Sequence, residues 1–488
     1  MLHKDGWRRI PGMKPEIKRA IQQLETRGWK NLSLEFGEAF LNLRVPADCA
    51  TLSMKEVAVL SDPRKSFEEA LSRPIGAPAI DKIIREKRKP VPELTVAVAV
   101  SDITRPVPYK GENGLLFPLL KRIEAWGIRR QNITIVVGTG THRPSTPAEK
   151  TEMFGEALVR EFRILDHDCE DSGCLTYLGK TQKQTDVYVN TAFFSADVRV
   201  VTGLVESHFM AGVSGGRKAV CPALVDRRTI EKFHGPDFLE SPCADSLILD
   251  GNPCHEEALD VARKVGVDFA VNVTLDKSMR LTGVFAGHLE ESHLAAFRFM
   301  REYTAIPLDR DFDIVLTHSG YAGRNHYQTA KAGCSALPAV KRGGTVIIAA
   351  DNRDREPIGS AVYRDLIGRL KTLGVDGYLK MITDPAWSFT KDQWEPEVWG
   401  RVLRKVGEAG LIYCSPQIPP LEFSRLPGRS GYDFIEKGKA LSGLEAARAM
   451  VQNALLYIYS QHLKKGRHPS MAVILEGPYG VPVLQPSS

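Results

Sequence analysis

Three side chains capable of chemistry occur between residues 206 and 234. The segment ESHFMAGVSGGRK (206–218) contains His208 and Lys218, and His234 follows it. Its small residues allow a bulky ligand to approach the backbone closely. A lysine amine can be acylated, so Lys218 is a candidate covalent anchor, and a neutral imidazole makes His234 a candidate metal ligand. Taken alone, a helix-capping lysine and a hydrogen-bonded histidine are the simpler explanation.

A second group, SDITRP at residues 101–106, directly follows an apolar run that predicts a strand. In open α/β sheets, ligands bind at the carboxyl ends of the strands. The permanent charge of Arg105 beside the carboxylate of Asp102 suits the fixing of a substrate carboxylate or a phosphate. The alternative is an Asp–Arg pair that only caps the loop.

The third group is the glycine-rich turn GTGTHRP at residues 138–144. Such a turn can bring backbone amides against a phosphate at a helix N-terminus. It lacks the third glycine of a Rossmann fingerprint and the lysine of a P-loop. At the end of a predicted strand, His142 is placed where an acid/base group would be useful, although a lone loop histidine is more often structural.

The elements that must position these groups follow a βαβ pattern. Short apolar runs predict strands, and longer amphipathic stretches between them predict helices. We expect strands at 94–100, 133–138, 198–203 and 269–275, and helices at 115–127 and 146–162. Thr146, Pro147 and Glu149 form a capping box with proline in the first turn, which marks the start of the second helix. Continuous apolar strands joined by helical crossovers indicate a parallel sheet covered on both faces.

A second α/β unit is expected after the helical stretch 294–306. Its predicted strands are 313–318, 343–350 and 410–415, followed by a long helix at 443–465 and a closing strand within 471–478. The sequence does not show which sheet this last strand joins. We therefore predict two α/β domains, each with a mainly parallel sheet flanked by helices and with the active site in the cleft between them. The expected domains are 1–297 and 298–488, and the first thirty or so residues are expected to form a peripheral helical extension.

Composition limits the classes of protein that this chain can represent. Its 488 residues are 43% hydrophobic, which suits large buried cores, and the net charge of +6 is spread along the chain. That spread argues against nucleic-acid partners. No run is long enough for a membrane span and the start is charged, so we expect a cytoplasmic protein without membrane partners. The eight cysteines are scattered and expected to be reduced; Cys254–His255 and the Cys169/Cys174 pair are weak metal-site alternatives.

The separated motifs together resemble the lactate racemase family, over most of the chain. The matching pieces are D-x-T-R-P at 102–106, G-T-H-R at 140–143, H-x-x-A-G-x-S-G-G-R-K at 208–218, His234, Tyr327–Gln328 with Lys331, Asp392–Gln393–Trp394, and EGPY at 476–479. They occur in family order and at family-like spacing. Chance agreement of one short motif is common, but agreement of this series is improbable.

This resemblance implies a nickel-pincer nucleotide, a pyridinium mononucleotide joined to Lys218 through a thioamide. Its nickel would be held by a ring carbon, two sulfurs and His234, a donor set that suits square-planar nickel. The resemblance also assigns the following residues. His142 and His208 are the catalytic acid/base pair; Asp102, Ile103, Thr104 and Arg105 line the cofactor and substrate pocket; Tyr327, Gln328 and Lys331 bind the substrate; and Trp394 closes the pocket. Cofactor-assembly enzymes are implied partners.

The implied reaction is racemisation or epimerisation of a small 2-hydroxy acid. One histidine takes the hydroxyl proton as the C2 hydride moves to the cofactor, which leaves a planar 2-keto acid. Return of the hydride to the opposite face, with the other histidine supplying the proton, gives the epimer. Arg105 and Lys331 would keep the carboxylate fixed while the carbonyl reorients.

Other functions stay open at this point. The loop 320–326 contains Arg324 and His326, which could accept a second carboxylate, as in malate, or the hydroxyls of a sugar acid; a solvated loop is the alternative. An NAD-type 2-hydroxy acid oxidoreductase is a further candidate, although the expected G-x-G-x-x-G is missing. A non-catalytic nickel- or nucleotide-binding protein would not need both His142 and His208.

Overall fold

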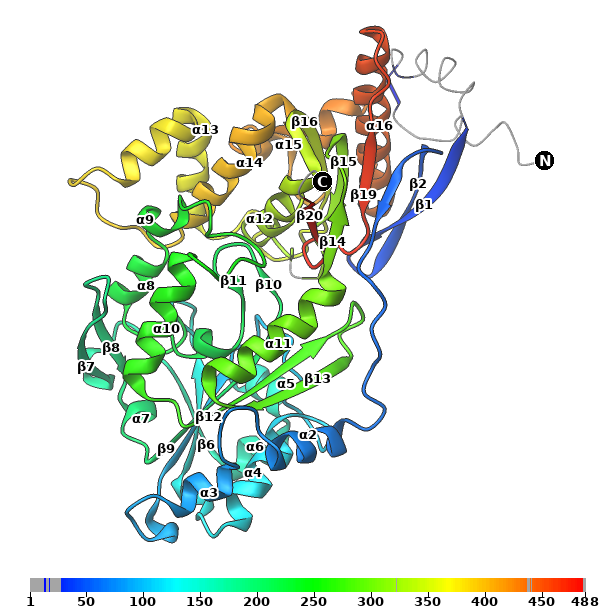
Figure 1. The fold of residues 1–488 in the computed structure, drawn as a ribbon. Helices are drawn as coiled ribbons and strands as arrows, with labels where there is room; N and C mark the ends of the chain where they lie inside the picture. The colour runs from blue at the N-terminus through cyan, green and yellow to red at the C-terminus, as the bar shows by residue number, and fades with distance from the viewer. Residues whose placement is uncertain are drawn as a thin grey trace. The chain divides into compact units, whose positions relative to one another are not determined.

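The computed structural model describes residues 13, 14, 17, 28–321, 323–436, 439 and 441–485. The chain divides into two compact units. The middle unit is Glu56–Tyr303, and the terminal unit combines Met1–Lys55 with Thr304–Ser488. Each unit contains a six-stranded sheet (Figure 1). The predicted α/β class with two parallel-sheet cores is confirmed.

The sheet of the middle unit has the order β13-β12-β9-β4-β5-β6. Its strands are β4 (Val96–Ser101), β5 (Ile133–Gly138), β6 (Arg163–Asp166), β9 (Val198–Leu204), β12 (Phe269–Leu275) and β13 (Leu281–Gly287). All neighbours are parallel except β12 and β13. The chain runs from β4 through β5 to β6 and then continues at β9, on the other side of β4. This reversal makes the carboxyl end of β4 a topological switch point, where α/β sheets bind ligands.

Helices cover this sheet (Figure 1). They are α2 (Pro63–Ser72), α3 (Ile80–Arg85), α4 (Leu116–Ala125), α5 (Pro147–Phe154), α6 (Glu156–Glu161), α7 (Thr191–Phe194), α8 (Arg227–Phe233), α9 (Pro236–Leu239), α10 (Pro253–Val265) and α11 (Leu289–Thr304). Two small antiparallel pairs complete the unit. They are β7 (Leu175–Lys180) with β8 (Asp186–Asn190), and β10 (Ser207–His208) with β11 (Gly212–Val213).

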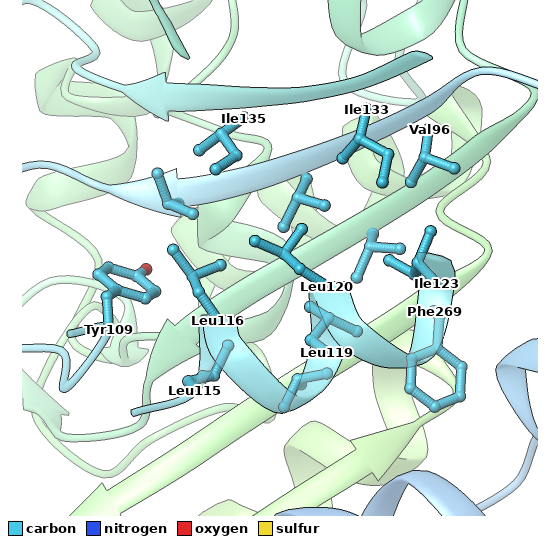
Figure 2. Packing of buried hydrophobic residues seen from close by; sticks show 14 of the residues in the cluster. Val96, Tyr109, Leu115, Leu116, Leu119, Leu120, Ile123, Ile133, Ile135 and Phe269 are labelled. Carbon is cyan, nitrogen blue, oxygen red and sulfur yellow. The ribbon is translucent and has the colours of Figure 1, made fainter. Parts of the chain in front are cut away.

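The apolar face of α4 shows why this region folds as a helix on a sheet. Its leucines and isoleucine recur at helical spacing, and the buried ones are Leu116, Leu119, Leu120 and Ile123. They pack toward Ile133 and Ile135 of β5 and Val96 of β4 (Figure 2). Burial of these side chains fixes α4 as the crossover between two parallel strands.

The helix expected at 146–162 is two helices. Its N-terminus is as predicted, because Thr146 and Glu149 form the reciprocal capping box. Gly155 then adopts φ +83°, which ends α5 and begins α6. Glycine reaches this conformation without the steric penalty that other residues meet, so the helical pattern is interrupted there.

The terminal unit has a sheet of order β18-β17-β16-β15-β19-β3, in which all neighbours are parallel. Its strands are β3 (Ala50–Leu52), β15 (Phe312–His318), β16 (Val340–Ala349), β17 (Leu411–Cys414), β18 (Arg429–Ser430) and β19 (Met471–Ile474). The closing strand β19, whose partner the sequence left open, lies between β15 and β3. The terminal unit also contains four strands outside this sheet: β1 (Trp29–Phe36), β2 (Ala39–Pro46), β14 (Ala305–Leu308) and β20 (Val481–Leu484).

The helices of the terminal unit are α12 (His326–Ser335), α13 (Ala361–Ile382), α14 (Trp394–Gly410), α15 (Pro420–Phe423) and α16 (Gly443–Lys464). The long helix α16 packs against the β1–β2 hairpin. Gln452 accepts a hydrogen bond from the Arg44 N–H at 2.7 Å and donates one to the Arg44 carbonyl at 3.0 Å. The side chain of one helical residue therefore continues the hydrogen bonding of a strand.

The division of the chain differs from the expected 1–297 and 298–488. The residues before Glu56 belong with the C-terminal half because β3 pairs with β19. The chain passes from the middle unit back to the terminal unit after Tyr303. Three residues are too short a strand to be recognised without its partner. Most of the expected N-terminal helical extension lies outside the described residues.

Further expectations from composition can be compared with the described part of the chain. None of its helices has the length and apolarity needed to span a lipid bilayer. All eight cysteines are free thiols, as predicted. Within the same residues no group of three His, Cys, Asp or Glu side chains could hold a metal, so the Cys254–His255 and Cys169/Cys174 alternatives have no support.

We expect Leu116→Ala to lower the free energy of unfolding by about 2–5 kcal/mol, because it leaves a cavity against the sheet. The matched control is Leu421→Ala, whose side chain is 87% exposed and should change stability by no more than about 0.5 kcal/mol. Urea titration followed by fluorescence measures both. Equal effects of the two substitutions would contradict this assignment of the core.

Candidate active site

The three groups singled out in the sequence lie at one edge of the middle-unit sheet. Asp102 and Arg105 follow β4, His142 follows β5, and Glu206 and His208 follow β9. Because β4 lies between β5 and β9, the carboxyl ends of the three strands are adjacent. The topology therefore brings together residues that are about a hundred positions apart in the chain.

Asp102 and His142 form a hydrogen-bonded dyad. The Oδ2 atom of Asp102 lies 2.6 Å from Nδ1 of His142, and its Oδ1 atom accepts hydrogen bonds from the hydroxyl and N–H of Thr104. Burial favours a raised pKa for the Asp102 carboxyl, but the bonds from His142 and Thr104 outweigh it and lower that pKa. An ionised Asp102 accepts the Nδ1–H of His142 and leaves the lone pair on Nε2, which suits a general base.

Arg105 is held by a carboxylate to which sequence analysis gave no role. Its Nη1 atom lies 3.0 Å from Oε1 of Glu206, and both side chains are about three-quarters buried. The backbone of Glu206 is in turn fixed by Ser214, which exchanges hydrogen bonds with its N–H and carbonyl. Glu206 thus positions the guanidinium that was predicted to bind a carboxylate. Its partner Arg105 is about a hundred positions away, so nothing in the local sequence indicated this role.

His208 and Lys218 contact each other directly. Nε2 of His208 lies 3.0 Å from Nζ of Lys218. His208 is buried at the start of the β10–β11 pair, where its ring stacks on Phe209. Burial lowers the pKa of the Lys218 amine well below its ordinary value, and the positive charges of Arg105 and Arg217 lower it further. The lysine predicted as a covalent anchor is therefore kept in an environment that disfavours its ammonium form.

The glycine-rich turn before Lys218 is packed against the sheet without room for side chains. Gly215 has φ +74°, and a Cβ on Gly203 would lie 3.1 Å from the Gly215 Cα. Gly216 has φ +50°, and a Cβ there would lie 2.7 Å from the ring of His293. These close approaches explain why the segment contains glycine in succession.

Arg217, to which sequence analysis gave no role, stabilises this turn through hydrogen bonds of its buried guanidinium. Its side chain is only 1% exposed and donates a hydrogen bond to the Ala211 carbonyl at 2.7 Å. It also lies 2.9 Å from Nε2 of His293. Burial lowers the pKa of Arg217 to about 9. The guanidinium joins the β10–β11 pair to the turn, and so fixes the backbone on both sides of the His208–Lys218 contact.

His234 lies at the C-terminal end of α8, whose N-terminus is capped by Asp226. Its Nδ1 atom lies 3.0 Å from the carbonyl of Ile230, which can only accept, so Nδ1 carries the proton. Burial lowers the pKa of His234 to about 3. A neutral imidazole with its lone pair on Nε2 and its other nitrogen held by a backbone carbonyl is the form that binds metals.

The residues present fit the nucleotide implied by the resemblance. An amine kept from its ammonium form suits a covalent bond through Nζ of Lys218, and a neutral imidazole at His234 suits a soft nickel centre. Phe233 links the two residues, because its ring centroid lies 5.2 Å from Nζ of Lys218 and 4.8 Å from the ring centroid of His234. Ile103 and Thr104 complete the loop after β4 that carries Asp102 and Arg105.

The remaining predicted residues lie in the terminal unit. Tyr327, Gln328 and Lys331 lie on α12, whose N-terminus is capped by the Asn325 side chain through the Gln328 N–H. Trp394 begins α14 and is 5% exposed. Its indole N–H donates to the Tyr327 hydroxyl at 3.0 Å, so the structure brings these two predicted residues together.

A buried carboxylate, Glu395, stands beside these residues and was missed in the sequence. It is 2% exposed, and burial raises its pKa although the charge of Lys331 opposes the change. The same carboxylate, together with Asp392, contributes to the raised pKa of Tyr327, for which burial is the main cause. A single glutamate in a helical pattern gave no signal of burial.

The structure gives no support to the alternative in which His326 accepts a second carboxylate. His326 is 1% exposed, stacks on Trp399 and lies 2.8 Å from the Tyr363 hydroxyl through Nδ1. Burial lowers the pKa of His326 to about 3, so it is a neutral core residue. Arg324 is exposed and lies 3.9 Å from Asp354, an ion pair of little energetic value. As the first residue of α12, His326 points about 100° away from its neighbour Tyr327.

Known proteins similar to this chain include lactate racemases. A family model of the lactate racemase N-terminal domain matches residues 36–246. The lactate racemase of Lactiplantibacillus plantarum is 32% identical over 346 residues, which cover 70% of this chain and 77% of that protein. The lactate racemase of Thermoanaerobacterium thermosaccharolyticum is 29% identical over 388 residues, covering 76% and 86% respectively.

Solved structures share the fold. The lactate racemase apoprotein of T. thermosaccharolyticum superposes with a TM-score of 0.77 at 24% identity, over 94% of this chain and all of that one. A Thermotoga maritima protein gives 0.60 at 17% identity, over 88% of this chain and all of that one. Fold, site and relatives together define an isomerase of the racemase class. The chain belongs to the lactate racemase family.

We expect Asp102→Asn to lower the racemase turnover number by about 10²- to 10⁴-fold, because an amide no longer fixes the His142 tautomer. Thr104→Val is the matched control: it removes one bond to Asp102 and leaves the dyad in place, so its loss should stay below about tenfold. Steady-state kinetics of both variants measure this. Wild-type turnover in Asp102→Asn would show that the dyad is not used.

Proposed function

We propose that this chain is a nickel-pincer nucleotide-dependent racemase or epimerase of a 2-hydroxy acid. The observation that carries the proposal is the presence of two histidines with separate supports beside one lysine at a single sheet edge. His142 is supported by Asp102, and His208 contacts Lys218. The relatives named lactate racemase support the reaction class, and the neutral His234 supports a metal ligand.

Lys218 would hold the nucleotide covalently, and His234 would supply an imidazole ligand to its nickel. When bound, the nucleotide supplies a ring carbon that accepts the C2 hydride of the substrate and returns it. Enzymes that assemble this cofactor are therefore proposed partners. Side chains of the protein would carry out the proton transfers and bind the substrate.

In one direction, Nε2 of His142 takes the proton of the substrate hydroxyl, and the ionised Asp102 stabilises the imidazolium that forms. His208 supplies the proton to the keto oxygen presented from the other side, and the roles exchange in the reverse direction. Loss of hydride from C2 gives a planar 2-keto acid without stereochemistry. Two acid/base groups are needed because each serves one hand of the substrate.

Arg105, positioned by Glu206, would hold the substrate carboxylate with its remaining N–H donors while the carbonyl turns. We extend the proposal to Gln328 and Lys331 as further carboxylate donors and to Tyr327 and Trp394 as the wall of the substrate pocket. The Trp394–Tyr327 hydrogen bond supports a shared function for these two.

Lactate is the substrate that the relatives' names favour. The argument for malate or a sugar acid rested on Arg324 and His326, and with His326 in the core only the exposed Arg324 remains for it. The oxidoreductase alternative has no support from the comparisons. We therefore propose a small 2-hydroxy acid as the substrate class, with lactate to be tested first.

Retention of hydrogen at C2 tests the proposed hydride transfer. We expect C2-deuterated L-lactate, incubated with the cofactor-loaded enzyme in H₂O, to give D-lactate that keeps its deuterium, because a hydride does not exchange with water. Chiral chromatography with mass spectrometry measures both. Racemisation with loss of the label would favour proton abstraction at C2, and turnover of malate or gluconate but not lactate would exclude lactate as the substrate.

The tether and the nickel ligand can be separated by mutation. In protein produced with the cofactor-assembly enzymes, we expect Lys218→Ala to lack the added nucleotide mass. His234→Ala should keep that mass but lose at least tenfold in nickel content, because it removes a ligand and leaves the tether. Lys232→Ala, on the exposed face of α8, is the control and should keep both.

Intact-mass spectrometry and metal analysis give the two readouts independently. An adduct that persists in Lys218→Ala would move the tether to another residue. Full nickel occupancy in His234→Ala would refute the ligand role.

A further inference from the structure

The hydrogen bonds around His208 define which of its nitrogens carries the proton. The backbone N–H groups of Met210 and Ala211 both donate to Nδ1 of His208, each at 3.2 Å. A nitrogen that accepts hydrogen bonds cannot itself be protonated. In the neutral ring, the single proton of His208 is therefore on Nε2. This is the opposite tautomer to that of His142, whose Nδ1 proton is held by Asp102.

The His208 tautomer defines the state of Lys218. Nε2–H of His208 points at Nζ of Lys218, 3.0 Å away, and can only donate. An ammonium group has three donors and no lone pair, whereas a neutral amine can accept. The hydrogen bond therefore requires Lys218 to be a neutral amine. The hydrogen bonds of His208 thus indicate a neutral Lys218 independently of the burial that lowers the lysine pKa.

The charged and titratable groups around Lys218 agree with this state. Arg105 on the loop after β4 and Arg217 on the turn before Lys218 both lower its pKa, while the thiols of Cys221 and Cys254 act weakly in the opposite direction. Glu206 is directed to Arg105, and the ring of Phe233, 5.2 Å from Nζ, also favours a cation. Burial and the charges of the two arginines outweigh the thiols and the ring, so the lysine pKa is lowered.

We propose that in the cofactor-free protein His208 holds Lys218 as a neutral nucleophile, so that the chain acylates itself at Lys218 with an activated carboxyl or thiocarboxyl compound. The Nζ lone pair attacks the acyl carbon, the new C–N bond forms and the bond to the leaving group breaks. The leaving group takes its electron pair and one proton of the amine. The product is an amide or thioamide, so no separate acylating enzyme is needed for the bond itself. This rests on the proposed covalent cofactor.

Acylation also removes the hydrogen-bond acceptor of His208. The nitrogen of an amide has lost the accepting lone pair, so Nε2–H of His208 no longer has Lys218 as its acceptor. Nε2–H of His208 is then available to donate a hydrogen bond to the substrate oxygen. One residue would thus act twice, first on the lysine and later in the reaction.

Trace labelling of the cofactor-free full chain with acetic anhydride tests the amine state. The neutral fraction of an ordinary lysine rises about tenfold with each pH unit below its pKa. With Nα-acetyl-lysine amide added as the internal standard, we expect the Lys218 rate to change less than threefold between pH 7 and pH 9, while the standard rises about a hundredfold. Peptide mass spectrometry measures both. A Lys218 rate that rises in parallel with the standard would overturn the proposal.

Variants at His208 separate its role from burial. His208→Phe removes the donor, and we expect the Lys218 rate at pH 7 to fall about tenfold. His208→Gln restores an N–H donor and should recover most of the rate, and His462→Gln in the terminal unit should leave it unchanged. An unchanged rate in His208→Phe would assign the neutral amine to burial alone and overturn the role of His208.

A second measurement does not depend on the folding of a variant. The ¹⁵N spectrum of histidine-labelled wild-type protein distinguishes a proton on Nε2 from one on Nδ1, and finding the His208 proton on Nδ1 would also overturn the proposal. Neither readout uses a hydroxy acid. Absence of racemisation with intact labelling at Lys218 would therefore contradict the proposed function and leave this inference standing.

Discussion

The partial burial of Lys218 and His234 is the constraint on which the site depends. Taking a charged group into a medium of low dielectric is costly, and a basic side chain responds by giving up its proton. Burial is the largest cause of the lowered pKa of both residues. A neutral amine can form a covalent bond and a neutral imidazole can bind a metal, so the same physical effect leaves both side chains in a reactive neutral form.

That burial is made possible by backbone packing. Gly203 and Gly215 meet where a side chain on either would collide, and Arg217 is buried where it joins the turn to the β10–β11 pair. An arginine with its positive charge among apolar atoms is expensive unless its hydrogen bonds are satisfied. Arg217 offsets part of this cost through Ala211 and lowers the lysine pKa through its charge. One side chain, Arg217, therefore both stabilises the turn and lowers the pKa of Lys218.

Much of the fold could be predicted because its strands are buried on both faces and are therefore continuously apolar. The strands at 133–138 and 269–275 have the predicted bounds. Long-range pairing could not be predicted in the same way. The three residues of β3 become a strand only against β19, and the apolar pattern of a helix does not reveal that Gly155 adopts a positive φ and divides it.

The candidate site was predictable where strand ends carry chemically distinctive side chains. Asp102 and His142 were found in this way, whereas His208 and Lys218 were found in a segment rich in small residues, and the structure brings all four to one edge. Residues that act through others carried no such signal: Glu206 matters through its bond to Arg105, a partner about a hundred positions away. On a helix, neighbouring residues point in different directions, which is why the pattern of the loop did not reveal that His326 is a core residue.

The two catalytic histidine candidates are not equivalent, although a reversible racemisation treats its two products alike. A carboxylate fixes His142, so its proton state follows the charge of Asp102 and its Nε2 is a base from the start. Nδ1 of His208 instead accepts from backbone N–H groups, whose charge is fixed, so its Nε2 begins as a donor. The two histidines must therefore serve the two enantiomers from different starting protonation states. Acylation of Lys218 changes the state of only one of them, because converting the amine to an amide removes the acceptor that the His208 proton requires.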